Sequence, residues 1–185
     1  MIVLAVVGMP GSGKTIAASY LKSKGFPVVS LGAIVLDEVV RRGLPITPGN
    51  ERIVREDLRR HHGMDVCAAR ALAQIRDELT HHRLVVIDGL YSWSEYQTLR
   101  KEFGDALVVL AVCAPRALRY ARLASRPHRP LTEVEAEQRD FSEIETLEKG
   151  GPIAIADLIV LNEGPIDQLS DRIEGFLGLL VSSGP

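Results

Sequence analysis

The apolar residues of the chain gather in short runs, separated by longer stretches in which apolar and polar positions recur at helical spacing. The runs are rich in valine, isoleucine and leucine, and such near-continuous runs are typical of strands buried on both faces. They predict five strands, at residues 2–7, 28–31, 84–87, 106–112 and 158–161. The alternation of these runs with helical patterns predicts an α/β fold, in which a five-stranded parallel sheet lies between two layers of helices.

Local sequence signals mark where helices begin and where loops lie. Ser92-x-x-Glu95 and Thr132-x-x-Glu135 have the form of a capping box, so each predicts the start of a helix. Residues 46–50, Ile-Thr-Pro-Gly-Asn, predict a loop between two helices. The chain has no internal repeat, low-complexity tract or long linker, so residues 1–185 are expected to form a single domain.

Composition excludes several classes of partner. With 22 basic and 24 acidic residues the formal charge is -2, which predicts no binding of nucleic acid or of an anionic membrane through bulk charge. No apolar run reaches the roughly 18 residues of a membrane span. Cys67 and Cys113 lie in apolar surroundings and are expected to be buried free thiols in a reducing compartment. These features predict a cytoplasmic protein.

A phosphate-binding motif follows the first predicted strand. The stretch Gly8-Met9-Pro10-Gly11-Ser12-Gly13-Lys14-Thr15 matches the P-loop pattern Gly, any four, Gly-Lys-Ser/Thr. Its glycines let the backbone curl, so that successive N–H groups hold a polyphosphate at the start of the next helix. Lys14 is expected to reach the β- and γ-phosphates of ATP, and the Thr15 hydroxyl to ligate Mg²⁺. The residues expected to bind nucleotide here are Gly8, Gly11, Ser12, Gly13, Lys14 and Thr15.

The third predicted strand ends in an acid. Leu84-Val85-Val86-Ile87-Asp88-Gly89 has the form of a Walker B element, in which the acid holds Mg²⁺ opposite the hydroxyl of the P-loop. An Asp before Gly also caps ordinary turns. The P-loop upstream favours the metal role, so Thr15 and Asp88 are the predicted ligands of Mg²⁺.

Arginines crowd the region after the fourth predicted strand. They stand at Arg116, Arg119, Arg122, Arg126 and Arg129, and Arg139 lies in the next predicted helix. Their spacing predicts that Arg119, Arg122 and Arg126 share one helical face. Such a run is often a solvated basic face. Because the preceding strand ends on the ligand side of the sheet, Arg122, Arg126 and Arg139 are expected near the γ-phosphate, where they would stabilise charge in the transition state.

The length of the chain, its N-terminal P-loop and its five strands resemble those of the nucleoside and nucleotide kinase group of P-loop proteins. This resemblance implies an acceptor-binding helical region at about residues 32–80 and an arginine-rich lid at about 119–148. It also implies that one of Arg122 and Arg126 packs on the adenine and that the other reaches phosphate.

The stretch from Asp157 to Gly164 resembles the last strand and loop of dephospho-coenzyme A kinase, which implies that Asn162 borders the adenine. Short relatives of that enzyme share two further elements, here residues 150–157 and 85–92. The resemblance implies ATP- and Mg²⁺-dependent phosphoryl transfer to a small nucleotide-like acceptor.

One departure from that enzyme concerns the general base. Dephospho-coenzyme A kinase carries an Asp-x-Asp pair after the second strand, whereas this chain reads Ser30-Leu31-Gly32. An alcohol acceptor needs a base to remove its proton, and the candidates are Asp37 and Asp88. A nucleoside monophosphate acceptor already presents an anionic oxygen. Two alternatives therefore stay open: a nucleoside monophosphate kinase, and a nucleotide-hydrolysing switch without a small acceptor.

Several further side chains allow both a functional and a structural interpretation. The helical region after the second predicted strand is rich in arginine, which would fit either binding of an anionic acceptor or an exposed helix face. Arg59 is the one favoured for binding. The arginines are Arg41, Arg42, Arg55, Arg59 and Arg60. Tyr91 and Trp93 either wall the acceptor pocket or pack in the core. The adjacent pairs His61-His62 and His81-His82 point to different sides of a helix and are expected at helix ends or on the surface, not in a metal site.

Overall fold

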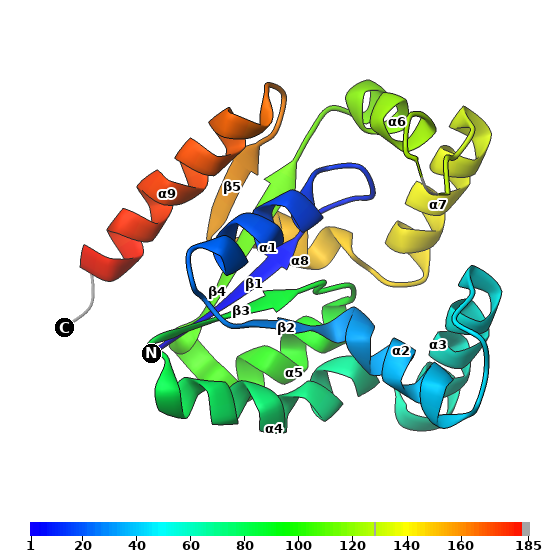
Figure 1. The fold of residues 1–185 in the computed structure, drawn as a ribbon, viewed down its shortest axis with the longest axis horizontal. Helices are drawn as coiled ribbons and strands as arrows, with labels where there is room; N and C mark the ends of the chain where they lie inside the picture. Colours follow the sequence, from blue (N-terminus) through cyan, green and yellow to red (C-terminus); the bar gives the residue numbers. More distant parts are fainter. Residues whose placement is uncertain (128, 183–185) are drawn as a thin grey trace.

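A computed structural model describes residues 1–127 and 129–182 of the chain (Figure 1). The first half contains β1 (Ile2–Val7), α1 (Lys14–Ser23), β2 (Val28–Ser30), α2 (Leu31–Arg41), α3 (Pro48–His62), α4 (Val66–His81) and β3 (Leu84–Asp88). The second half contains α5 (Trp93–Phe103), the 3₁₀ turn η1 (Gly104–Ala106), β4 (Leu107–Cys113), α6 (Arg116–Ala124), α7 (Glu133–Glu145), α8 (Gly150–Ala154), β5 (Leu158–Leu161) and α9 (Ile166–Ser182).

The five strands form one parallel sheet in the order β2-β3-β1-β4-β5, which confirms the predicted fold class. β1 lies at the centre, between β3 and β4. The register sets Asp88 beside both Val6 of β1 and Ser30 of β2. Ligands of open α/β sheets bind beyond the carboxyl ends of the strands, and in this sheet Asp88 and the loop after β1 both lie at that edge.

Helices cover both faces of the sheet, because its central strands are apolar on both sides. Side chains of β1 such as Val3 and Ala5 pack with α2 to α5 on one face, whereas Leu4 and Val6 pack with α1 and α9 on the other. The three layers are visible in Figure 1, with α1 and α9 on one side of the strands and α4 and α5 on the other. Each hydrophobic layer is mostly aliphatic, in keeping with the low aromatic content of 5%.

Several predicted boundaries are confirmed and others are wrong. Both capping boxes form, so α5 begins after Ser92 and α7 after Thr132. The predicted loop at 46–50 is wrong in its second half, because Pro48 occupies the first turn of α3 and the Thr47 hydroxyl caps that helix by accepting from Asn50 N at 3.2 Å. β2 also ends one residue early, since Leu31 already begins α2.

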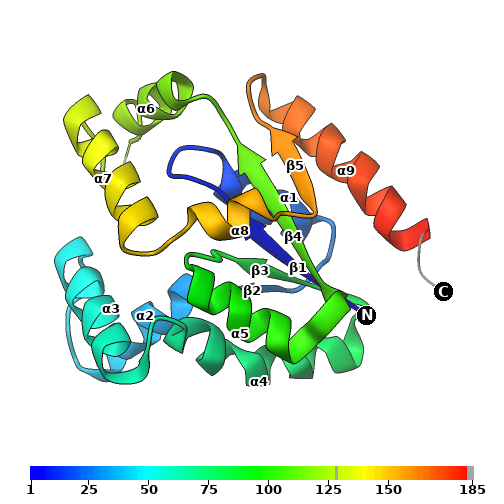
Figure 2. The same ribbon diagram turned by 180° about the vertical axis from the view of Figure 1, so that it is seen from behind.

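Two pairs of helices stand beyond the carboxyl edge of the sheet. α2 and α3 lie on one side of this edge and α6 and α7 on the other, and both views show α7 opposite α3 (Figures 1 and 2).

Cys67 is buried as expected, while Cys113 is only half-buried, and both are free thiols. Among the residues that the structure describes, no helix has the length and apolarity needed to span a membrane.

Candidate active site

The loop from Gly8 to Gly13 connects β1 to α1 and has the backbone of a phosphate cradle. Gly11 and Gly13 adopt φ values of 78° and 104°, in the left-handed region that side chains disfavour. A Cβ atom at Gly11 would also lie 2.7 Å from the carbonyl oxygen of Arg119, so a larger residue would push the loop away from α6. The glycines are thus required both by the curl of the loop and by its close packing.

Two polar groups inside this loop lack a strong protein partner. The Ser12 side chain is fully buried, and its hydroxyl oxygen has no hydrogen-bond partner among the described residues. Among the described residues, the Lys14 ammonium donates only to the carbonyl oxygen of Met9, at 3.2 Å. Burial, followed by the charge of Arg139, lowers the pKa of Lys14 to about 8, whereas Asp88 acts in the opposite direction. An anion in the loop would satisfy both groups.

Asp88 and Thr15 supply the oxygen atoms that a hard cation prefers. Asp88 ends β3 at the carboxyl edge, where burial raises the pKa of its carboxyl group and the charge of Lys14 opposes that rise. Thr15 lies in the first turn of α1 and is exposed. A hydroxyl and a carboxylate beside a phosphate cradle fit the ligand set of Mg²⁺, which keeps its other positions for water and phosphate.

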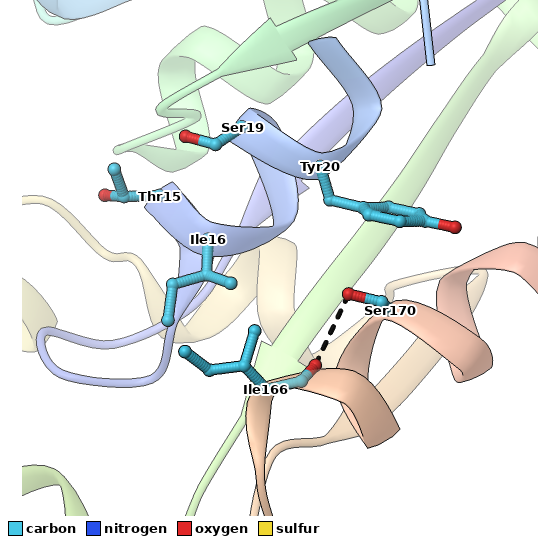
Figure 3. A pocket seen from close by; sticks show the side chains of 6 residues that line it. All are labelled: Thr15, Ile16, Ser19, Tyr20, Ile166 and Ser170. Atoms are coloured by element: carbon cyan, nitrogen blue, oxygen red, sulfur yellow. Dashed lines mark hydrogen bonds between the residues drawn. The ribbon is translucent and has the colours of Figure 1, made fainter. Parts of the chain in front are cut away.

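A shallow groove of about 370 Å³ runs from Thr15 along the outer side of α1 to the start of α9. In Figure 3 Ile16 and Ile166 point toward each other across it, and Ser170 donates to the carbonyl oxygen of Ile166 at 3.3 Å. Ile16 and Ile166 are exposed, so the groove offers an apolar surface next to the phosphate loop.

Arg119 is a structural tie and not a free cation. Its guanidinium is buried and donates to both carboxylate oxygens of Asp140 in α7, at 2.9 and 2.5 Å, and to the carbonyl oxygen of Pro10, at 3.0 Å. It thereby connects α6, α7 and the phosphate loop. The predicted common face of Arg119, Arg122 and Arg126 is wrong, because α6 ends at Ala124 and Arg126 lies in the segment that follows.

The other predicted arginines lie around the loop. Arg122 approaches the side-chain oxygen of Asn162 at 3.5 Å, and the Asn162 amide donates to the carbonyl oxygen of Ser12 at 2.8 Å. The charges of Arg139 and Arg126 both lower the pKa of Lys14. The structure therefore gathers residues from α6, α7 and the β5–α9 loop around one phosphate cradle.

A cavity of about 620 Å³ opens beside this cradle, between α2, α3 and α7. Arg55, Arg59, Tyr91 and Arg139 line it. Trp93 does not line the cavity: it stacks on Tyr96 with ring centroids 5.0 Å apart.

Three other residues considered for the acceptor lie elsewhere. Arg41 and Arg42 are both paired with Glu38, at 2.6 and 2.8 Å, so their charges are engaged outside the cavity. Asp37 is exposed on α2 and does not line the cavity. Asp88 thus remains as the candidate base that lies beside the phosphate loop.

The paired histidines lie at helix ends, as their placement in the sequence predicts. His61 and His62 are the last residues of α3, His81 is the last residue of α4, and His82 follows it. Within residues 1–127 and 129–182, no group of three or more His, Cys, Asp or Glu side chains is placed to hold a metal ion.

Lys149 is a buried lysine near the site that sequence reasoning missed. Its side chain is 1% exposed, forms an ion pair with Glu143, and lies 4.8 Å from the centre of the Tyr91 ring. Burial lowers the pKa of Lys149 to about 6, and the charges of Lys14 and Arg139 act in the same direction, while the charge of Glu95 acts in the opposite direction. The only local signal was its position before the Gly150-Gly151-Pro152 stretch.

Comparison with known proteins identifies relatives of the whole chain. Residues 7–148 match a family model described as an AAA domain. A UPF0200 protein of Thermococcus gammatolerans is 37% identical over 176 residues, which cover 94% of this chain and 92% of the relative.

Solved structures share the fold. TT1252 from Thermus thermophilus superposes with a TM-score of 0.66 and 23% identity, covering 97% of each chain. Shikimate kinase from Bacteroides thetaiotaomicron superposes with a TM-score of 0.61 and 12% identity, covering 96% of this chain and 98% of that structure.

Proposed function

This chain belongs to the UPF0200 family, and we propose that it is a kinase that transfers the γ-phosphoryl group of ATP to a small, nucleotide-like acceptor. The observation that carries the proposal is the half-buried ammonium of Lys14 in a glycine cradle, beside Asp88 and close to an arginine-lined cavity. A binding site for ATP thus adjoins a separate space for a second molecule. The shikimate kinase likeness supports the same reading, because that enzyme has the same fold and acts on a small molecule.

In the proposed reaction the protein supplies position and charge. Lys14 and the N–H groups of the loop bind the phosphates, and Thr15 and Asp88 would hold Mg²⁺. Mg²⁺, when bound, neutralises charge on the β- and γ-phosphates. Arg122, Arg126 and Arg139 would stabilise the negative charge that develops as the phosphoryl group moves. Asn162, which holds the loop through Ser12, would border the adenine.

The acceptor proposed from resemblance is dephospho-coenzyme A, with Asp88 as the base for its hydroxyl group. A nucleoside monophosphate is the second candidate. It is favoured by the exposure of Asp37 outside the cavity, since an anionic phosphate oxygen can attack without a base. Localisation in the cytoplasm, where ATP is abundant, is part of the proposal.

The test is acceptor-dependent formation of ADP by the purified protein, with dephospho-coenzyme A and the common nucleoside monophosphates as acceptors. Lys14→Ala should lower this activity by about two to three decades, because removing one preorganised charge contact costs roughly 3–4 kcal/mol. Its melting temperature should stay unchanged, since the hydrogen bond of Lys14 in the structure is a long one to a loop carbonyl oxygen.

The matched control is Lys22→Ala, which removes an exposed lysine from the last turn of the same helix and should keep full activity. Equal turnover of the Lys14→Ala and Lys22→Ala proteins would exclude the proposed role of the loop. ATP hydrolysis that no acceptor stimulates would instead favour a nucleotide-hydrolysing switch.

A further inference from the structure

The cavity beside the phosphate loop is walled by charged side chains from two helices. α3 contributes Arg52, Arg55 and Arg59, and α7 contributes Arg139 and Glu143. Figure 2 shows α3 and α7 facing each other across the carboxyl edge of the sheet. The volume of about 620 Å³ lies in the range of sites that enclose a small molecule.

Three of the arginines that line the cavity, including Arg129 from the segment between α6 and α7, already face a carboxylate. Arg129 donates to Glu51 at 3.0 Å, Arg139 lies 3.4 Å from Glu143, and Arg52 lies 3.9 Å from Glu56. The positive charges of these three arginines are therefore already balanced by protein carboxylates.

Arg55 and Arg59 differ from the others. Arg55 forms no hydrogen bond or ion pair with any residue that the structure describes, although it is half-buried. The Arg59 side chain is only 10% exposed, and its Nε atom has no hydrogen-bond partner among the described residues. Its nearest carboxylate oxygen is Oε1 of Glu95, at 4.0 Å, which is beyond hydrogen-bonding distance.

The two guanidinium groups also repel each other, because they carry like charges on the same side of α3. Arg55 and Arg59 are four residues apart on α3 and therefore project from one face of the helix. Burial, followed by the charge of Arg59, lowers the pKa of Arg55, while the charge of Glu56 acts in the opposite direction, so the two neighbouring guanidinium groups raise each other's electrostatic cost. A bound anion would remove this cost.

On the premise that the proposed function is right, we propose that Arg55 and Arg59 form the site that holds a phosphate group of the acceptor. A guanidinium presents planar, paired N–H donors that match phosphate oxygens, and two of them match a group with two negative charges better than a single carboxylate does. The rest of the acceptor lies against Leu31, Val35 and Leu147, which line the same cavity.

The phosphate can come from a nucleoside monophosphate or from the diphosphate bridge of dephospho-coenzyme A. Isothermal titration calorimetry would use protein loaded with AMPPNP·Mg²⁺, so that the nucleotide loop is filled. The four common nucleoside monophosphates and dephospho-coenzyme A are then titrated, with the four nucleosides as uncharged counterparts. For at least one phosphate-bearing ligand, the affinity should be about ten times that of the corresponding nucleoside or higher.

Arg55→Gln should lower the affinity for that ligand by about tenfold or more, because a charge-assisted hydrogen bond to phosphate is lost. Arg59→Gln should act in the same direction. The matched control is Arg60→Gln, which removes an exposed arginine of the same helix outside the cavity and should bind as the unmodified protein does. All three variants should bind AMPPNP with unchanged affinity, since the nucleotide loop is intact.

The arms of the experiment separate the two sources. If Arg55→Gln and Arg59→Gln weaken the binding of a nucleoside monophosphate but not of dephospho-coenzyme A, the site holds a phosphate monoester. If they weaken the binding of dephospho-coenzyme A but not of a monophosphate, the site holds the diphosphate bridge. Equal binding of nucleosides and nucleotides, or an Arg55→Gln protein that binds as the unmodified one does, would overturn the anion site.

Failure of the site and failure of the proposed function give different results. If ADP forms with an uncharged alcohol or a carboxylate such as shikimate while no phosphate-bearing ligand binds, the site is wrong and the kinase assignment stands. If AMPPNP itself does not bind, the proposed function is wrong. The anion site is then judged by the same titrations on the nucleotide-free protein.

Discussion

Replacing Arg119 by Gln should destabilise the protein strongly, because Arg119 is the buried tie between the phosphate loop and α7. The side chains of Arg119 and Asp140 are 8% and 7% exposed. Breaking a buried ion pair by removing one partner leaves the other charge uncompensated and costs about 3–5 kcal/mol. The Tyr120 hydroxyl still donates to Asp140 at 3.3 Å, so we expect a loss near the lower end, about 3 kcal/mol.

Thermal and urea unfolding measure this loss directly. In a domain of this length 1 kcal/mol corresponds to roughly 2–4 °C, so the melting temperature should fall by about 6–12 °C. The double variant Arg119→Met/Asp140→Leu should recover much of the stability, because no buried charge is left unpaired. Arg116→Gln is the control: Arg116 is exposed and lies 3.8 Å from Glu137, so its loss should cost about 0–1 kcal/mol.

Arg119 supports the phosphate loop and does not itself bind phosphate. An Arg119→Gln protein that melts like the unmodified protein but binds AMPPNP poorly would refute this role, since that pattern belongs to a residue that touches the nucleotide. A double variant no more stable than Arg119→Gln alone would also contradict the buried-charge argument.

Three further predictions concern the loop, the lid and a buried acid. Gly13→Ala should abolish detectable AMPPNP binding in a titration, because its Cβ would collide with the Asn162 side chain and strain a left-handed backbone. Hydrogen exchange in residues 119–148 should slow when AMPPNP·Mg²⁺ is added, because the proposed lid closes over nucleotide; equal exchange would count against it. Burial raises the pKa of Glu95 to about 7 from 4.5, so the folded state keeps a proton that the unfolded state loses and stability falls as pH rises through this window. Glu95→Gln should flatten that fall in urea titrations between about pH 4.5 and pH 7, and an unchanged slope would show that Glu95 does not cause it.

The features that the sequence predicts well depend on local pattern. Valine-rich runs predicted all five strands, and the spacing of Ser92 and Glu95 predicted the start of α5. The P-loop and the acid at Asp88 also lie where the alternation of strands and helices requires, at the carboxyl edge of a parallel sheet. Each of these signals is complete within a few residues, so no long-range packing is needed to read it.

The errors arise where distant partners decide the outcome. Arg41 and Arg55 look alike in sequence, yet Arg41 is paired with Glu38 while Arg55 faces the cavity. Arg119 was grouped with phosphate-binding arginines, because its partner Asp140 lies 21 residues away on another helix. Lys149 is buried against Tyr91 and Glu143, which lie 58 and 6 residues away in the chain. These roles are set by tertiary contacts that a single sequence does not display.

The central claim is that the loop and the cavity together move a phosphoryl group between two bound molecules. The most direct test incubates the protein with ATP labelled in its γ-phosphoryl group, Mg²⁺ and each candidate acceptor, and then identifies the labelled products by mass spectrometry. The account predicts label on an acceptor, with loss of that product in both Lys14→Ala and Arg55→Gln. Label found solely in free inorganic phosphate, at a rate that no acceptor changes, would contradict it.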